Sequence, residues 1–223
     1  LALYLAARIS AGMDMPDGTL SPQGGVVILS AEDGPGDTIR PRLEAAGADL
    51  AKVFILTMKG PEGERLLSIP EDVSAIEAAI LKAGAVLVIV DPLMAYLGAG
   101  VECYKDQAVR QALAPLASLA ERMVVAILII RNLNKGSGKA IYRGGGSIGI
   151  LAAVRAAFLV AKTPENSEAR VLACLKSNLG PHPVALAFHM EQAPNGAVRV
   201  IWDGQSEHTA ESLLARPGEE SWS

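Results

Sequence analysis

A continuous apolar run from Ala85 to Val90, which ends in Asp91, constrains the fold more than any other feature of this sequence. Its residues do not alternate between apolar and polar, which is typical of a strand buried on both faces of a parallel sheet. Gly25–Ala31 and Met123–Ile130 have the same character, and Val53–Leu56 reads as a shorter strand. Because parallel strands need long crossover connections, these runs predict helices between them.

The segments between these runs have helical spacing of their apolar residues or helical start and stop signals. The segment opened by Pro70 has proline in its first turn and stops at Gly84, and Asp106–Arg122 is amphipathic. The predicted helices are Leu1–Ser10, Asp37–Ala46, the segment from Pro70 to Gly84, Asp106–Arg122 and Ile148–Ala157.

From Phe158 onward the pattern changes to short apolar runs joined by turn-rich links, which favours antiparallel strands. We expect these strands to add to one edge of the parallel sheet. The fold class is therefore α/β, a mostly parallel sheet flanked by helices with antiparallel strands toward the C-terminus. Residues 1–208 form one core and 209–223 a tail. The antiparallel strands are predicted at Phe158–Ala161, Arg170–Leu175, Val184–Met190 and Val198–Trp202.

The composition narrows the class of protein. A net charge of −4 means that any contact with nucleic acid is local. The longest apolar runs are too short to cross a membrane, so we expect no membrane partner. The two cysteines have neither metal-type spacing nor a disulfide pattern, which fits a cytoplasmic protein.

Polar residues follow the predicted strands, at the edge where ligands bind in parallel α/β sheets. Asp91 could hold Mg²⁺ against nucleotide phosphates, or it could simply begin the turn at Pro92. Glu32 could orient and deprotonate an attacking water, with Asp33 beside it as a helper. The ordinary alternative for both is loop chemistry before Gly34.

The segment from Lys135 to Ser147 is basic, rich in glycine and carries one aromatic residue. Such a segment suits a loop that binds single-stranded DNA, or it is a solvated connection. It is not a phosphate-binding loop, because Leu133 and Ala140 stand where the pattern needs glycine and a hydroxyl. Its candidate DNA contacts are Lys135, Lys139, Tyr142 and Arg143.

Three residues near the predicted antiparallel strands could also serve a nucleotide. Arg155, among small apolar residues, is either a surface arginine or a finger that reaches the phosphate of a neighbouring subunit. Lys176 and Asn178 follow an apolar strand and could act at the same site, or they form a strand exit.

Taken in order, these pieces resemble the RepA family of hexameric replicative helicases, within the RecA-like ATPases. The matching segments are Leu1–Ala6, Ala31–Asp33 with Arg42, Leu43 and Gly47, Val90–Leu93, Asn132–Lys135, Tyr142–Ser147, Arg155 and Lys176–Gly180.

The resemblance implies an ATP- and Mg²⁺-dependent motor that translocates on single-stranded DNA as a hexameric ring. Glu32 would be the catalytic carboxylate and Asp91 the Walker B aspartate, while Asn132 would sense the γ-phosphate or DNA. Arg155 would be the finger across a subunit interface, supported by Lys176. The glycine-rich loop around Arg143 would face the channel of the ring. A primase is a further implied partner, because family members occur beside or fused to primase domains in plasmids and phages.

Two departures from the family pattern bear on activity. In the family, a phosphate-binding loop directly precedes the helix that matches Leu1–Ser10, and the 223 residues begin too late to contain it. Because that loop supplies most of the phosphate contacts, we expect these residues alone to bind ATP poorly. The family often has histidine where Asn132 stands, and asparagine cannot take a proton. The alternatives are a non-hydrolysing relative that docks in a ring or on DNA, and an unrelated α/β nucleotide enzyme, for which no G-x-G-x-x-G follows a strand.

Overall fold

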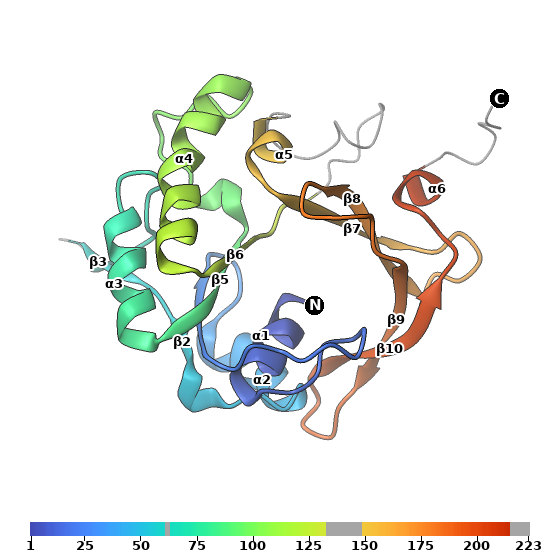
Figure 1. The fold of residues 1–223 in the computed structure, drawn as a ribbon. Coiled ribbons are helices and arrows are strands. Elements are labelled where there is room, and N and C mark those ends of the chain that lie inside the picture. The colour runs from blue at the N-terminus through green and yellow to red at the C-terminus, as the bar shows by residue number, and fades with distance from the viewer. Residues whose placement is uncertain (61–62, 133–148, 215–223) are drawn as a thin grey trace, which may run out of the picture.

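The structure is a computed structural model that describes residues 1–60, 63–132 and 149–214. One half of the molecule is built on a parallel sheet in the order β2-β1-β5-β6, and the other half contains the antiparallel strands (Figure 1). The sequence predicted all four strands from their apolar runs; β1 and β5 are buried along almost their whole length, whereas the outer strands β2 and β6 are partly exposed. Only the last strand differs clearly from its predicted bounds, Met123–Ile130, because Met123 is the last residue of a helix. The strands are β1 (Gly25–Ser30), β2 (Val53–Ile55), β5 (Ala85–Asp91) and β6 (Ala126–Ile129).

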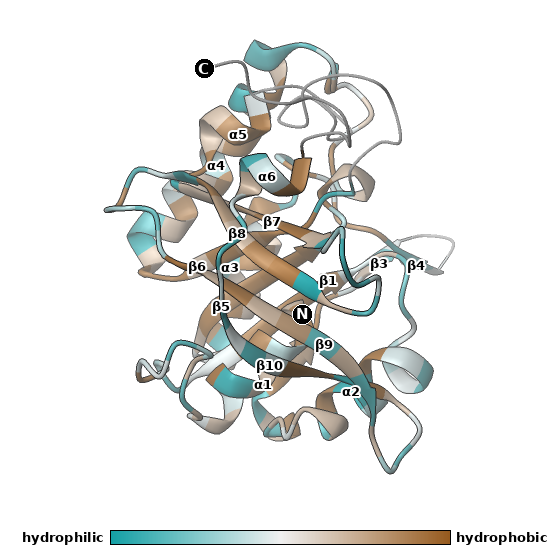
Figure 2. Ribbon diagram, turned by 90° about the vertical axis from the view of Figure 1, so that its right-hand side faces the viewer, coloured by the Kyte–Doolittle hydropathy of each residue, from teal (hydrophilic) through white to brown (hydrophobic). Residues whose placement is uncertain are grey.

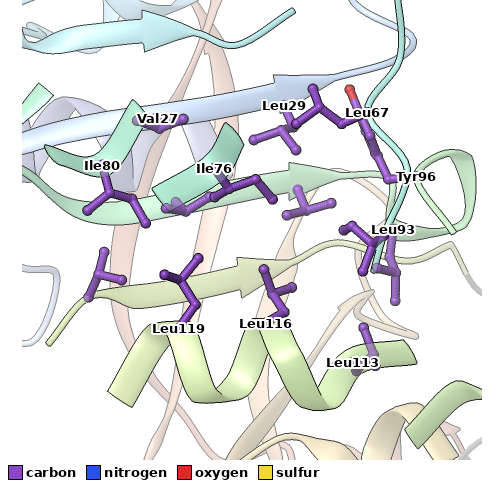
Figure 3. Packing of buried hydrophobic residues seen from close by; sticks show 14 of the residues in the cluster. Val27, Leu29, Leu67, Ile76, Ile80, Leu93, Tyr96, Leu113, Leu116 and Leu119 are labelled. Atoms are coloured by element: carbon purple, nitrogen blue, oxygen red, sulfur yellow. The ribbon is translucent and has the colours of Figure 1, made fainter. Parts of the chain in front are cut away.

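Helices cover both faces of this sheet. Helices α1 (Ala2–Ala11) and α2 (Arg40–Ala45) pack on one face, and a π-helix, Pro35–Ile39, leads into α2. Helices α3 (Val73–Ala83) and α4 (Asp106–Met123) pack on the other. Figure 3 shows leucines of α4 pointing at the strands beside isoleucines of α3. Two apolar layers therefore fix the sheet.

Helix α4 extends to Met123 because the residue that ends it, Val124, has an unusual backbone conformation. Val124 is left-handed, with a φ of 51°, and its N–H and that of Val125 bond back to the last turn of α4. Glycine is the usual residue for this conformation, and valine gives no stop signal in a sequence. The predicted strand therefore began too early.

The antiparallel strands form a sheet of their own in the order β10-β9-β8-β7. Within the described residues β7 pairs with β8 and β6 with β5, so the prediction that these strands add to the edge of the parallel sheet was wrong. Figure 2 shows apolar residues concentrated along the strands. The strands are β7 (Ala156–Lys162), β8 (Arg170–Ser177), β9 (Ala185–Gln192) and β10 (Val198–Ser206).

Side-chain packing, rather than strand pairing, holds the second sheet against α1. Tyr4 of α1 contacts Trp202 of β10 with a ring-centroid distance of 5.9 Å, and Trp202 lies 5.2 Å from Phe188 of β9. The side chain of Asn195, in the turn between β9 and β10, donates to the carbonyl of Pro41 in α2 at 2.9 Å. These contacts set the position of the sheet where no ladder of hydrogen bonds does.

The smaller elements complete the described chain. The hairpin β3 (Met58–Gly60) and β4 (Gly63–Arg65) was not predicted. Helix α5 (Gly149–Ala153) is shorter than the predicted Ile148–Ala157, and α6 (Ala210–Leu214), within the predicted tail, packs on β7 and β8. None of the described helices combines the length and apolar character that a membrane crossing needs.

Candidate nucleotide site

The strand order reverses between β1 and β5. The chain leaves β1 to form β2 on one side, then crosses over β1 to form β5 on the other side. In open parallel sheets a crevice forms at such a switch point, outside the carboxyl ends of the strands. Ser30 and Asp91 are register partners at the ends of β1 and β5, so both lie at this point.

Three carboxylates gather here. Asp91 ends β5 and is half-buried, and the loop after β1 carries Asp33, partly exposed, and Glu32, exposed. Burial raises the pKa of Asp91, and the charges of Asp33 and Glu32 raise it further, so all three carboxylates act on one another across this edge. The convergence predicted from the ends of these two strands is therefore present.

The loop that carries Glu32 is fixed on both sides of that residue. The N–H of Ala31 donates to the carbonyl of Asp91 at 3.0 Å. The N–H of Asp33 donates to the Ser30 hydroxyl at 3.2 Å, and the Asp33 carboxylate pairs with Arg42 of α2 at 3.0 Å. Glu32 thus projects from a tethered loop into solvent, where water can reach it.

The N-terminal end of α1 lies beside the same group. Leu1, at the N-terminal end of α1, lies within electrostatic range of both Arg42 and Asp91. The first N–H groups of a helix attract anions. A phosphate bound at this end of α1 would face the carboxylate of Asp91.

The residues present suit Mg²⁺ held together with a phosphate ligand. No group of three or more potential metal ligands among His, Cys, Asp and Glu occurs in the described part of the chain. Mg²⁺ usually takes one or two carboxylates and completes its shell with water and substrate phosphates. Asp91 fits this role, because its half-buried carboxylate has no hydrogen bond or ion pair to any described residue.

The raised pKa of Asp91 gives a test on stability. An acid whose pKa is higher in the folded state makes folding less favourable as the pH rises from the unfolded pKa, about 3.9, through the folded one. We therefore expect Asp91→Asn to have a larger free energy of unfolding than wild type at neutral pH. The difference should shrink as the pH falls toward about 4. Urea unfolding across a pH series measures it.

Asp72 provides a control of opposite sign. Arg65 lowers the pKa of Asp72 by hydrogen bonding, so Asp72→Asn should be less stable than wild type at neutral pH. An Asp91→Asn variant that is also less stable at neutral pH would contradict the crowding of carboxylates described above.

The other predicted site residues lie at the start of β7 and the end of β8. Arg155 lies in the bend between α5 and β7, not on a helix as predicted, and is exposed. Its carbonyl accepts the N–H of Asn178 at 2.9 Å, so these two residues are neighbours. The Lys176 ammonium donates to the carbonyls of Leu151 and Val154 at 2.7 and 2.8 Å. Lys176 therefore caps the end of α5 within its own chain.

Asn132 is exposed just beyond β6, close to the loop after Asp91, because the backbone of Ile130 bonds to both Val90 and Leu93. The four residues predicted to contact DNA, Lys135, Lys139, Tyr142 and Arg143, lie outside the described residues.

The comparison with known families is decisive for the class of this domain. The family described as an AAA domain (AAA_25) matches residues 1–138, which include Glu32, Asp33, Asp91 and Asn132. The chain belongs to this family. No curated protein matches this AAA domain by sequence.

Among solved structures, this AAA domain is similar to the RadB recombinase. The TM-score is 0.52 at 14% sequence identity, over 79% of this chain and 78% of the recombinase chain. At that identity the similarity concerns the fold alone, and it confirms the predicted RecA-like architecture. The AAA family and this fold place the chain among RecA-like ATPase domains.

Two residues near the carboxyl edge of the sheet had no individual role in the sequence-based prediction, although Arg131 begins a polar segment, Arg131–Lys135, that was expected to converge on this crevice. Tyr96 is 1% exposed, and burial together with the charge of Asp91 raises its pKa to about 12. Arg131 lies two residues beyond the end of β6 and is half-buried. The only signal for either was its position shortly after an apolar strand, which many loop residues share.

Proposed function

We propose that this AAA domain is the ATP-hydrolysing core of a motor that translocates on single-stranded DNA, of the kind found in RepA-type replicative helicases. The observation that carries the proposal is the convergence of Glu32, Asp33 and Asp91 at the switch point, beside the N-terminal end of α1. That arrangement combines a metal-binding carboxylate, an exposed base and a phosphate-binding helix end.

Each residue has a distinct task in this proposal. Mg²⁺ neutralises charge on the phosphates when bound. Asp91 holds the metal, Glu32 orients water and accepts its proton, and Arg42 holds Asp33 and so the loop in place. Asn132 provides a hydrogen bond at the adjacent strand end. Asn178 is also proposed to contact the nucleotide, because it lies next to Arg155.

The neighbouring subunit of a ring, six-membered as in the helicases that the sequence resembles, completes the site in this proposal. Arg155 is exposed and can reach a phosphate across an interface, where an arginine finger stabilises transition-state charge. Lys176 supports Arg155 indirectly, because its ammonium fixes the end of α5 just before that residue. Single-stranded DNA would bind the glycine-rich segment in the channel. A primase is a further proposed partner and the cytoplasm the proposed location.

The experiment is ATP turnover by the full-length protein, with and without oligothymidylate. We expect turnover that DNA stimulates, and Arg143→Ala should reduce the stimulation while Arg110→Ala, an exposed change on α4, should not. Turnover that DNA does not affect would contradict the motor. Binding of DNA and ATP without any turnover would favour the non-hydrolysing ring subunit.

A further inference from the structure

Arg131 lies at the carboxyl edge of the parallel sheet, directly after Ile130, whose backbone N–H and carbonyl are both hydrogen-bonded. The N–H of Ile130 donates to the carbonyl of Val90 at 2.9 Å, and the carbonyl of Ile130 accepts the N–H of Leu93 at 2.9 Å. These bonds tie the chain at Arg131 to the loop that follows Asp91. Arg131 is therefore held near the candidate site by the sheet itself.

The guanidinium of Arg131 is half-buried and has no counter-ion. Its Nε is fully buried without a hydrogen-bond partner, and no ion pair or hydrogen bond joins its side chain to any residue that the structure describes. Burial lowers its pKa. A charge removed from water without a partner is costly, so such a group is retained where something else compensates it.

Other arginines of the chain show the contrast. Arg42, Arg65 and Arg122 each bind a carboxylate at 3.0 Å or less. Arg199 also has a buried Nε without a partner, but its Nη2 binds Glu191 at 2.8 Å. Arg42, Arg65 and Arg122 are exposed, whereas Arg131 is partly buried and has no partner among the described residues. An anionic ligand would supply the missing partner.

We propose that Arg131 binds a phosphate oxyanion at this edge of the sheet. The inference rests on the proposed function, because it assumes that a phosphate ligand binds near Asp91. A planar guanidinium matches the oxygens of a phosphate through paired hydrogen bonds. Two sources supply this chemistry: the phosphates of the nucleotide and the backbone of the single-stranded DNA.

The test compares Arg131→Met and Arg131→Lys with wild type, and uses Arg110→Met as a control that removes an exposed arginine. Affinities for Mg²⁺ with a non-hydrolysable ATP analogue and for oligothymidylate are measured separately. Arg131→Met should weaken one of the two ligands by about 10- to 100-fold, and lysine should restore part of the loss. The weakened ligand identifies the source. If DNA is the weakened ligand, the slope of the logarithm of DNA affinity against the logarithm of salt concentration should also fall by about one unit.

A second readout separates ligand binding from a structural role. Because the unpaired charge is costly in the free protein, the urea midpoint of Arg131→Met without ligand should equal or exceed that of wild type. A lower midpoint, together with equal loss of both ligands, would overturn the inference, and so would affinities no different from those of Arg110→Met.

Failure of the proposed function looks different. A wild-type protein that binds neither ATP nor DNA would contradict that function. In that case the phosphate-binding role of Arg131 is tested by measuring the affinity of wild type and Arg131→Met for inorganic pyrophosphate. Binding that Arg131→Met abolishes would support the inference by itself, and absent binding or binding that the variant retains would overturn it.

Discussion

Replacing Glu32 with glutamine is expected to lower the rate of ATP hydrolysis by about 10²- to 10⁴-fold, the usual contribution of a general base. Glutamine keeps the shape and the hydrogen-bonding atoms of the side chain but cannot take the proton of the attacking water. Its loop should not move, because it is held by backbone and hydroxyl contacts of Ala31 and Asp33. Nucleotide affinity should therefore be unchanged while turnover falls.

Single-turnover hydrolysis and equilibrium binding, measured on the same full-length protein, separate these two quantities. Glu121→Gln is the matched control, because Glu121 is an exposed glutamate on α4, on the opposite face of the sheet from α1. It should leave both quantities as in wild type. Undiminished hydrolysis by Glu32→Gln would remove Glu32 from the mechanism.

Replacing Leu119 with alanine is expected to lower the free energy of unfolding by about 2–5 kcal/mol, since it opens a cavity in the largest core cluster. Leu119 is 0% exposed and points from α4 toward the sheet in Figure 3, near Ile80 of α3. The loss arises from transfer of the removed methyl groups and from the cavity that remains.

Leu81 of α3 is the control, because it is a helical leucine that is 67% exposed. Leu81→Ala should change the free energy of unfolding by about 0.5 kcal/mol or less. Urea unfolding of both variants gives the comparison. Equal effects of the two substitutions would contradict the packing of α4 on the sheet.

The parallel sheet and its edge of carboxylates could be predicted because local patterns determine them. Runs such as Ala85–Val90 have no polar face, which favours strands of a parallel sheet, and the carboxyl ends of parallel strands share one edge. Asp91 and Glu32 follow directly from that geometry. The RecA-like ATPase class followed from the same residues in order. The finer assignment to RepA-type helicases stays a proposal.

The remaining features depend on contacts between distant parts of the chain. The second sheet is placed by packing of Trp202 on Tyr4 and Phe188 rather than by strand pairing. The pattern of apolar residues in the sequence does not predict such a contact. Lys176 reads as a site residue in sequence, but its ammonium finds two carbonyls at the end of α5 only in the fold. Arg131 becomes notable only through its burial without a partner.

The Mg²⁺ dependence of nucleotide affinity tests the central claim, that Asp91 holds the metal at the switch point, most directly. The affinity of the full-length protein for a non-hydrolysable ATP analogue is measured with Mg²⁺ and with EDTA, in wild type and in Asp91→Asn. The account predicts that Mg²⁺ tightens binding to wild type and that this tightening is lost in the variant. An equal effect of Mg²⁺ on both proteins would contradict it.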